Sequence, residues 1–472
     1  YVHDDKYRDI KHIHSNGEER FAYNQNNQKT LYVDRLGNKT QYAYDPAGNL
    51  VRVIDALGNK TEIRYGEKNQ PTGIRINGKE KLCGEYDAQG RLVKTKDALG
   101  NETGIRYNEA GRPEEIRQAD GSLVRLSYDD RGNITELRDA QGNRTCYAYD
   151  DLNRMTESID GKGNVTRYTY DIMGNVTRIE NAEGNSQSYE YNASGKVTKV
   201  TDFDGESIRR EYNVLNRPSK AIDKEGRETL LTYDSMWNLA RVTTPDGART
   251  TYLYNEENLL SRIKYADGAV VRYTYDANDC LVKEHHTLPG GSRDVIRAYD
   301  KDSRETSVTC GSAKVEKAFD ELGRLSTIKR NGGKHTTTYT YETASDGGQT
   351  GRVKTVKNGS HSENYTYDIW GNVTKVTENS SQTGKAYAYD AQGQLIREYD
   401  PDKKVWLGYK YDAGGNLTEV RSYPAAEGGS PEGEGTVIKK FAYGTAWKDQ
   451  LTAMTMDGTT RNFTYDANGN LL

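Results

Sequence analysis

The chain has 472 residues, of which 66 are Lys or Arg and 70 are Asp or Glu, so that the formal net charge is −4. This balance excludes the basic excess that is typical of nucleic-acid-binding proteins. Hydrophobic residues make up 34% and charged residues 29%, which by itself leans toward disorder, but the 36 tyrosines indicate an ordered protein because disordered chains are poor in aromatic residues.

Three regions follow one another along the chain: residues 1–22 form a degenerate incoming repeat, 23–275 a regular array, and 276–472 an irregular continuation with loop insertions. The array is defined by tyrosines that recur every 21 residues without a gap. A fixed period of this size predicts one supersecondary unit copied end to end. The periodic tyrosines, which we expect to be structural, are Tyr23, Tyr44, Tyr65, Tyr86, Tyr107, Tyr128, Tyr149, Tyr170, Tyr191, Tyr212, Tyr233, Tyr254 and Tyr275.

The representative repeat Tyr44–Tyr65 carries two turn signals of the form Asp-x-x-Gly-Asn, ten residues apart. Asp at the start of a turn can accept hydrogen bonds from the backbone, and Gly or Asn tolerates a positive φ at its end. This pattern predicts a type I turn closed by a bulge, a common hairpin connection. We expect the structural turn residues to include Asp45, Gly48, Asp55, Gly58, Asp87, Gly90, Asp129, Gly132, Asp171 and Gly174.

The position four residues after the periodic tyrosine is Gly or Asn in eleven of the thirteen repeats, and only Trp237 and Asp279 depart from this rule. Between the turns lie two short segments that alternate apolar and polar residues, as in Tyr42-Ala43-Tyr44 and Arg52-Val53. This alternation predicts two half-buried strands per repeat, with the aromatic residues on one face. No segment has the period of a helix.

The expected fold is therefore all-β: an antiparallel hairpin ribbon that coils into a shell with its tyrosine face inside, because long open sheets must curl. A parallel β-helix with 21-residue coils remains the alternative at this stage. Insertions in the irregular region localise to the loops Thr343–Gly351 and Tyr423–Gly435, and we expect a partner site to lie in that half of the chain.

No catalytic, cofactor or metal site is expected. The aspartates fall at turn starts, which accounts for them without hydrolysis, and the turns lack the spacing of a calcium loop. His12 and His14 lie one residue apart and His285 and His286 are adjacent, but no Cys, Asp or Glu stands at a set distance in the sequence to complete a zinc site. Asn-x-Ser/Thr sequons follow from the turn sequence.

The four cysteines, Cys83, Cys146, Cys280 and Cys310, form no C-x-x-C pair, so neither a zinc site nor a redox pair is indicated. There is no stretch of about 18 apolar residues, so no membrane span is expected. The chain begins at Tyr1 without Met and ends at Leu472 inside a new repeat, and we expect it to be a piece of a longer protein.

The pattern Tyr-Asp-x-x-Gly-Asn/Arg-Leu, as at Tyr44-Asp45, Tyr170-Asp171 and Tyr411-Asp412, resembles the YD repeat of bacterial RHS proteins, toxin-complex subunits, wall-associated toxins and teneurins. The resemblance covers nearly the whole chain. It implies a hollow β-shell that, in bacterial members, encloses a C-terminal toxin and is secreted or displayed at the cell surface. The core motifs that end such shells, with their self-cleaving aspartates, and the toxin itself are absent before Leu472.

Through this resemblance we expect a structural scaffold, not an enzyme, with an encapsulated toxin domain, other shell segments or a secretion apparatus as partners. The alternative is a surface adhesion or glycan-binding module, for which exposed aromatic residues on the outer face would be expected. A β-helix would be a filled rod without room for cargo, so the two architectures separate the two functions.

Overall fold

The computed structural model describes residues 1–344, 348–424, 433–445, 447–466 and 468–472. Within these ranges the protein is all-β, with 43 strands and no helix, and every strand pair in the described registers is antiparallel and joins strands that follow one another in the chain. The predicted antiparallel ribbon is thus confirmed, and the parallel β-helix is wrong. Of the predicted loops Thr343–Gly351 and Tyr423–Gly435, residues 345–347 and 425–432 lie outside the described residues.

The first strands, up to the end of the fifth tyrosine-containing hairpin, are β1 (Val2–His3), β2 (Asp9–His14), β3 (Gly17–Tyr23), β4 (Lys29–Val33), β5 (Lys39–Tyr44), β6 (Leu50–Ile54), β7 (Lys60–Tyr65), β8 (Pro71–Ile76), β9 (Lys79–Tyr86), β10 (Leu92–Asp97), β11 (Glu102–Tyr107) and β12 (Pro113–Arg117). The regular array continues with β13 (Leu123–Tyr128), β14 (Ile134–Arg138), β15 (Arg144–Tyr149), β16 (Met155–Ile159), β17 (Val165–Tyr170), β18 (Val176–Glu180), β19 (Ser186–Tyr191), β20 (Val197–Thr201), β21 (Ser207–Tyr212), β22 (Pro218–Ile222), β23 (Glu228–Tyr233), β24 (Leu239–Thr243), β25 (Arg249–Tyr254), β26 (Leu260–Lys264) and β27 (Val270–Tyr275).

The remaining strands, several of them longer, are β28 (Leu281–Leu288), β29 (Gly291–Tyr299), β30 (Glu305–Cys310), β31 (Ala313–Phe319), β32 (Leu325–Arg330), β33 (His335–Thr343), β34 (Gln349–Asn358), β35 (His361–Tyr367), β36 (Val373–Glu378), β37 (Gly384–Tyr389), β38 (Leu395–Asp400), β39 (Val405–Tyr411), β40 (Leu417–Pro424), β41 (Thr436–Tyr443), β42 (Leu451–Met456) and β43 (Thr459–Asn462).

Two kinds of turn alternate along the ribbon, and they lie on its two opposite edges. A tyrosine turn, such as residues 45–49, follows a periodic tyrosine; an intervening turn, such as 55–59, follows the next strand. Both have the same backbone bonds: the N–H of Gly48 donates to the carbonyl of Asp45 at 3.0 Å, and that of Gly58 to the carbonyl of Asp55 at 3.1 Å. Tyrosine turns are preceded by a register shift, as between Ala43 and Tyr44 in β5, so these bulges recur along one edge; a shift beside an intervening turn lies between Ile74 and Arg75 in β8.

The two faces of the ribbon differ in chemistry. On one face Tyr42 pairs directly with Val53, and Tyr168 with Ile179. Arg210, which stands two residues before Tyr212 in place of the usual apolar residue, pairs with the small Ala221. On the other face ion pairs run across the strands.

The ion pairs on that second face bridge three consecutive strands. Glu115 of β12 accepts from Arg106 of β11 at 3.3 Å and from Arg125 of β13 at 3.1 Å. Lys220 of β22 lies 3.5 Å from Glu211 and 3.1 Å from Glu228. Many acidic and basic side chains thus neutralise one another across the strands, and like charges also stand opposite each other, as Arg125 does opposite Arg138.

The apolar layer is thin. Among the described residues only Ala269, Val271, Tyr399 and Val420 are hydrophobic and buried, and no large side chain is less than 2% exposed. The tyrosine face is therefore half-covered by neighbouring strands of the same sheet and not by a second layer. A ribbon of this kind must obtain stability from contacts within the sheet and along its edges.

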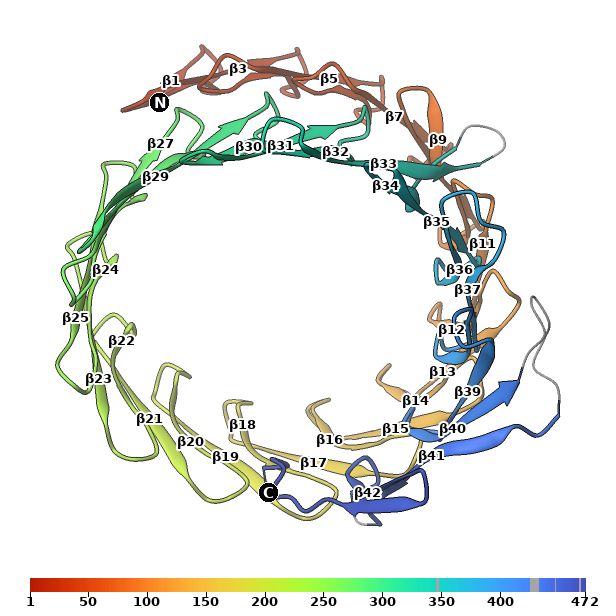
Figure 1. Cartoon of the computed structure of the whole chain (residues 1–472). Helices are drawn as coiled ribbons and strands as arrows, with labels where there is room; N and C mark the ends of the chain where they lie inside the picture. The colour runs from red at the N-terminus through yellow and green to blue at the C-terminus, as the bar shows by residue number, and fades with distance from the viewer. Residues whose placement is uncertain (345–347, 425–432, 446, 467) are drawn as a thin grey trace. The chain divides into compact units, whose positions relative to one another are not determined.

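The structure divides into two compact units, each made of an earlier and a later stretch of the ribbon: residues 1–102 with 231–363, and 103–230 with 364–472. In the first unit the stretch around β3 and β5 lies beside β30 to β32 (Figure 1). In the second unit the stretch around β12 to β15 lies beside β36 to β39 (Figure 1).

In both units the stretches dock through unlike edges. Intervening turns of the earlier stretch contact tyrosine turns of the later one: Asn278 Nδ2 donates to Asp34 Oδ2 at 2.7 Å in the first unit, and Lys162 Nζ lies 3.0 Å from Asp412 Oδ2 in the second. The sequence separation is 244 residues for the first contact but 253 for that of Asp139 with Gln392 and 265 for that of Phe203 with Asn468.

The docking register is constant when counted in turns instead of residues. We number the tyrosine turns from the one that follows Tyr23. The intervening turn that comes after tyrosine turn 1 contacts tyrosine turn 13, which follows Tyr275, and the intervening turn that comes after tyrosine turn 3 contacts tyrosine turn 15, which follows Phe319. In the second unit the intervening turn after tyrosine turn 6 contacts tyrosine turn 18, and the intervening turn after tyrosine turn 9 contacts tyrosine turn 21. The offset is twelve turns each time, so longer strands in the later stretch leave the docking unchanged.

This constancy predicts that losing one repeat disturbs every docking contact. Deletion of residues 213–233 removes one tyrosine turn between the docked stretches and moves all later turns by one position. We expect the free energy of unfolding to fall by more than about 3 kcal/mol, since unpairing a buried ion pair alone has that effect. The measurement is chemical unfolding followed by circular dichroism.

The control replaces 213–233 with a second copy of residues 234–254, which changes the sequence but keeps the turn count. We expect this variant to unfold close to the wild type. Equal unfolding of the deletion and the replacement variants would show that the register of the docked turns carries no stability.

Candidate functional site

Each periodic tyrosine ties its hairpin to the preceding one. The hydroxyl of Tyr149 donates to the carbonyl of Ile134 at 3.0 Å, and that of Tyr170 to the carbonyl of Met155 at 2.7 Å. The acceptor belongs to the residue that pairs with the previous tyrosine, as Ile134 pairs with Tyr128, next to the bulge. Because the strand ladder is interrupted at a bulge, the hydroxyl supplies a partner to a backbone carbonyl there.

The same bond to a residue 15 positions earlier is made by Tyr44, Tyr65, Tyr86, Tyr128, Tyr191, Tyr212, Tyr254 and Tyr275. Tyr23 donates to the carbonyl of Asp9, and the later tyrosines Tyr299, Tyr341, Tyr389, Tyr411 and Tyr443 make the equivalent bond over longer separations. Burial raises the pKa of Tyr149, which keeps the hydroxyl protonated as a donor.

The turn aspartates use both carboxylate oxygens inside their own turn. Asp45 Oδ1 accepts from the N–H of Asn49 at 2.8 Å and its Oδ2 from Asn49 Nδ2 at 2.9 Å. Asp87 is held in the same way by Arg91. The hydrogen bond from the Asn49 side chain lowers the pKa of Asp45. The corresponding bonds are made by Asp55, Asp97, Asp129, Asp139, Asp160 and Asp171.

The left-handed position of the tyrosine turns is occupied in all thirteen regular repeats. The glycines predicted to close turns have positive φ: Gly48 92°, Gly90 85°, Gly132 98° and Gly174 86° in tyrosine turns, and Gly58 90° in an intervening turn. Trp237 and Asp279, which we expected to depart from the rule, also adopt it, with φ of 66° and 64°. The bonded register on both sides of the turn therefore imposes the conformation even on residues that disfavour it.

Arginines at the end of some tyrosine turns reach the next repeat. The guanidinium of Arg154 pairs with Asp150 at 2.7 Å and lies 4.7 Å from the ring centre of Tyr170. Arg304 makes the same contact with Phe319 at 4.8 Å. Cation–π contacts of this kind link adjacent turns on one edge of the ribbon.

Lys162 is the most enclosed charge at the docked edges of the second unit, with a side chain only 9% exposed. Its Nζ lies 3.0 Å from carboxylate oxygens of both Asp412 and Asp449, and 4.9 Å from the ring centre of Tyr443. An added Cβ at Gly161 would lie 2.7 Å from the carbonyl oxygen of Ala413, so the two edges meet at backbone distance.

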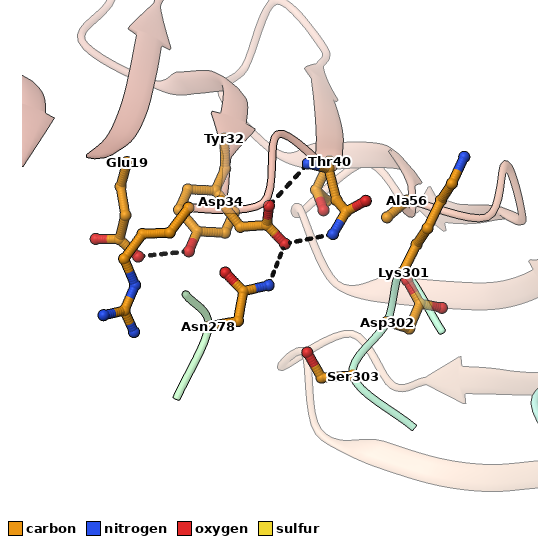
Figure 2. Close-up of a pocket in the computed structure, with 11 residues that line it drawn as sticks. Glu19, Tyr32, Asp34, Thr40, Ala56, Asn278, Lys301, Asp302 and Ser303 are labelled. Carbon is orange, nitrogen blue, oxygen red and sulfur yellow. Dashed lines mark hydrogen bonds between the residues drawn. The ribbon is translucent and has the colours of Figure 1, made fainter. Parts of the chain in front are cut away.

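A polar cavity of about 400 Å³ lies beside the docked turns of the first unit (Figure 2). Asp34 accepts from Asn278, and Glu19 Oε1 accepts from the hydroxyl of Tyr32 at 2.6 Å (Figure 2). Burial raises the pKa of Asp302, which lines the other side of the cavity. Its lining groups mostly pair with one another, which is typical of a crevice between docked edges.

The two histidine pairs noted in the sequence have different surroundings. His285 Nδ1 lies 2.6 Å from Asp294 and His286 Nε2 lies 3.0 Å from Glu284; as neighbours in β28 they point to opposite faces and share no site. His12 and His14 lie on one face of β2 and converge with Glu19 of β3. Cys83, Cys146, Cys280 and Cys310 are free thiols. Among the described residues no helix is long and apolar enough to cross a membrane.

Sequence reasoning missed Glu19 and Lys162 because both act through partners far away or across a strand. Lys162 did carry a signal, since it stands between Gly161 and Gly163 in its turn and bare backbone on both sides permits close approach. For Glu19 the signal was the tight β2–β3 turn, which places it directly opposite His12.

Comparison with known proteins matches two family models to this repeat. The teneurin YD-shell model matches residues 137–348, and the RHS repeat model matches 23–61, 86–123 and 389–427. The chain is a YD/RHS-repeat protein. Comparison with curated proteins gives no significant match.

Solved structures share the fold of this YD/RHS-repeat protein. A crystal structure titled TcdB2-TccC3-TEV matches with a TM-score of 0.77 at 13% identity, over 98% of this chain and 33% of that one. A Tc holotoxin pore of Photorhabdus luminescens matches with a TM-score of 0.59 at 14% identity, over 96% of this chain and 30% of that one. The chain therefore spans about a third of the length of these proteins, and the matches show a shared fold. Together with the YD-shell and RHS repeat models, this fold supports a shell scaffold.

The tyrosine bond predicts a specific cost for removing one hydroxyl. Tyr149→Phe leaves the ring but deprives the carbonyl of Ile134 of its donor, and we expect a loss of about 1 kcal/mol in the free energy of unfolding. Tyr147→Phe in the same strand is the control, because no hydrogen bond is described for its hydroxyl, and we expect less than half that loss. Chemical unfolding measures both; similar values would contradict the assigned role of the bond.

The docked edges give a second prediction. Lys162→Ala leaves Asp412 and Asp449 facing each other without their shared cation, and we expect a loss of about 3 kcal/mol. Lys79→Ala is the comparison, because Lys79 pairs with Glu321 across the docked edges of the first unit but both side chains are well exposed, 40% and 52%, so its loss should stay below about 1 kcal/mol. Differential scanning calorimetry distinguishes the two; a reversed order would refute the ranking by burial.

Proposed function

We propose that this chain is a wall segment of a hollow β-shell that encloses a C-terminal toxin domain in a secreted or surface-displayed bacterial protein of the polymorphic-toxin type. The observation that carries the proposal is the fold match to toxin-complex structures along 98% of the chain. The encapsulated domain would be the principal partner, with other shell segments or a secretion apparatus as further ones.

The construction of the ribbon suits a wall. It is one sheet thick, and no large side chain in the described ranges is fully buried, as expected of a surface that separates two spaces and not of a filled rod. Docking of intervening turns on tyrosine turns joins adjacent stretches within each unit, and in the second unit the edges meet at backbone distance. We propose that the tyrosine face lines the interior and that the ion-pair lattice faces solvent.

Exposed apolar side chains on tyrosine turns support docking of a further shell segment. In the second unit the turns of the earlier stretch expose Leu152, Ile172, Met173, Val214 and Leu215, and Ile172 and Val214 are 97% and 95% exposed. The equivalent turns of the later stretch are the ones that receive intervening turns. We propose that another stretch of the same kind covers the exposed ones, since the docking contact is already built into the repeat.

The adhesion alternative receives no support from the periodic tyrosines. A tyrosine that stacks on a sugar needs an accessible ring, whereas these rings are half-buried and their hydroxyls are bound to the backbone. The same observation favours a structural role for the periodic tyrosines, which hold adjacent hairpins together.

The test is limited proteolysis of the full-length gene product. We expect the residues downstream of Leu472 to be protected in the wild type and to be cleaved at least tenfold faster in Lys162→Ala, whose opened edge admits the protease. Lys79→Ala is the control and should protect as well as the wild type. Rapid cleavage of the downstream residues in the folded wild type would refute enclosure.

A further inference from the structure

Two histidines and a glutamate cluster in the β2–β3 hairpin, apart from the contacts that build the repeat. His12 and His14 are two residues apart in β2, so their side chains leave the same face of the strand. Glu19 of β3 pairs directly with His12 and shares that face. All three side chains are partly enclosed, with 25%, 29% and 21% of their surface exposed.

The distances within this cluster fit a shared ion better than direct hydrogen bonds. Glu19 Oε2 lies 3.4 Å from His12 Nδ1 and 3.4 Å from His14 Nε2. Hydrogen bonds between nitrogen and oxygen are usually about 2.7–3.2 Å long. Donor atoms bound to one tetrahedral zinc ion at about 2.0–2.1 Å are roughly 3.4 Å apart. One donor atom from each of the three residues lies within 4.8 Å of the donor atoms of the other two.

Each of the three side chains also has a partner on its far side. His12 Nε2 lies 3.2 Å from Asp9 Oδ2, and Glu19 Oε1 accepts the hydroxyl of Tyr32 at 2.6 Å. His14 Nδ1 faces Glu257 Oε2 at 3.7 Å. Metal-binding histidines commonly direct their second nitrogen at a carboxylate, which fixes the ring and strengthens it as a ligand.

Glu257 belongs to the later stretch of the first unit and is itself fixed by docking. The N–H and the hydroxyl of Ser15 donate to its Oε1 at 2.9 Å and 2.7 Å. The carboxylates of Asp9, Glu19 and Glu257 surround the histidines, while the nearby guanidinium of Arg35 is paired with Asp279. The local charge therefore favours a cation.

We propose that His12, His14 and Glu19 bind one divalent transition-metal ion, for which zinc is the best match to two imidazoles and one carboxylate. Water takes the fourth position, and Glu19 also lines the polar cavity of Figure 2, which provides an entry path. Because His14 faces Glu257 of the later stretch at ion-pair distance, 3.7 Å, the bound ion strengthens the docking of the later stretch on the earlier one. The site would exist whether or not the shell encloses a cargo.

The experiment titrates Co²⁺, a spectroscopic substitute for zinc, into the metal-free protein and follows visible absorption, with Zn²⁺ added afterwards as competitor. We expect one equivalent to bind with the bands of a tetrahedral ion and zinc to displace it. His14→Ala and Glu19→Gln should each weaken binding at least 100-fold, and Glu257→Gln about tenfold, through loss of ligand orientation.

His285→Ala is the matched control. His285 also pairs with a carboxylate in the first unit but belongs to no cluster of three ligand side chains among the described residues, so this variant should bind cobalt like the wild type. Circular dichroism in the absence of metal establishes that each variant is folded. Unchanged binding by the folded His14→Ala variant, or the charge-transfer bands of a cysteine thiolate, would overturn the proposal.

Discussion

The main constraint on this structure is that a single sheet must be stable without a second layer to cover it. Stacked sheets bury side chains from both sides, whereas this ribbon buries its tyrosine face only against its own strands. The compensation is the repeated bond from each periodic tyrosine to a backbone carbonyl of the preceding hairpin. The residue therefore acts twice, because its ring fills the apolar face and its hydroxyl supplies the partner that the bulge removes. Phenylalanine could do only the first.

Much of this fold was predictable from the sequence because its determinants are local. The period, the two turns per repeat and the alternation within each strand all lie within 21 residues, and they lead directly to antiparallel hairpins. The acceptor of the tyrosine hydroxyl was not predictable in the same way. The position of that acceptor depends on the bulge, which shifts the pairing between Ala43 and Tyr44.

The features that escaped prediction are those that depend on pairing across space. Trp237 and Asp279 take a left-handed conformation because the strands on both sides determine the turn. Glu19 joins the two histidines through the register of one short hairpin, and Lys162 meets Asp412 through edges that are far apart in the chain. No local pattern encodes a contact of that range, and the domain limits proposed from the spacing of tyrosines stay a prediction.

The docking of unlike edges gives the ribbon a polarity. A surface that binds an identical surface pairs two copies and then stops. A surface that binds a different surface leaves one unoccupied surface at each end of the assembly. Adding further stretches through this contact is therefore directional. However many stretches are added, one edge of tyrosine turns and one edge of intervening turns remain undocked. A stack of docked stretches built this way is therefore ended by parts of a different design, and those parts, not the repeat itself, determine how many stretches it contains.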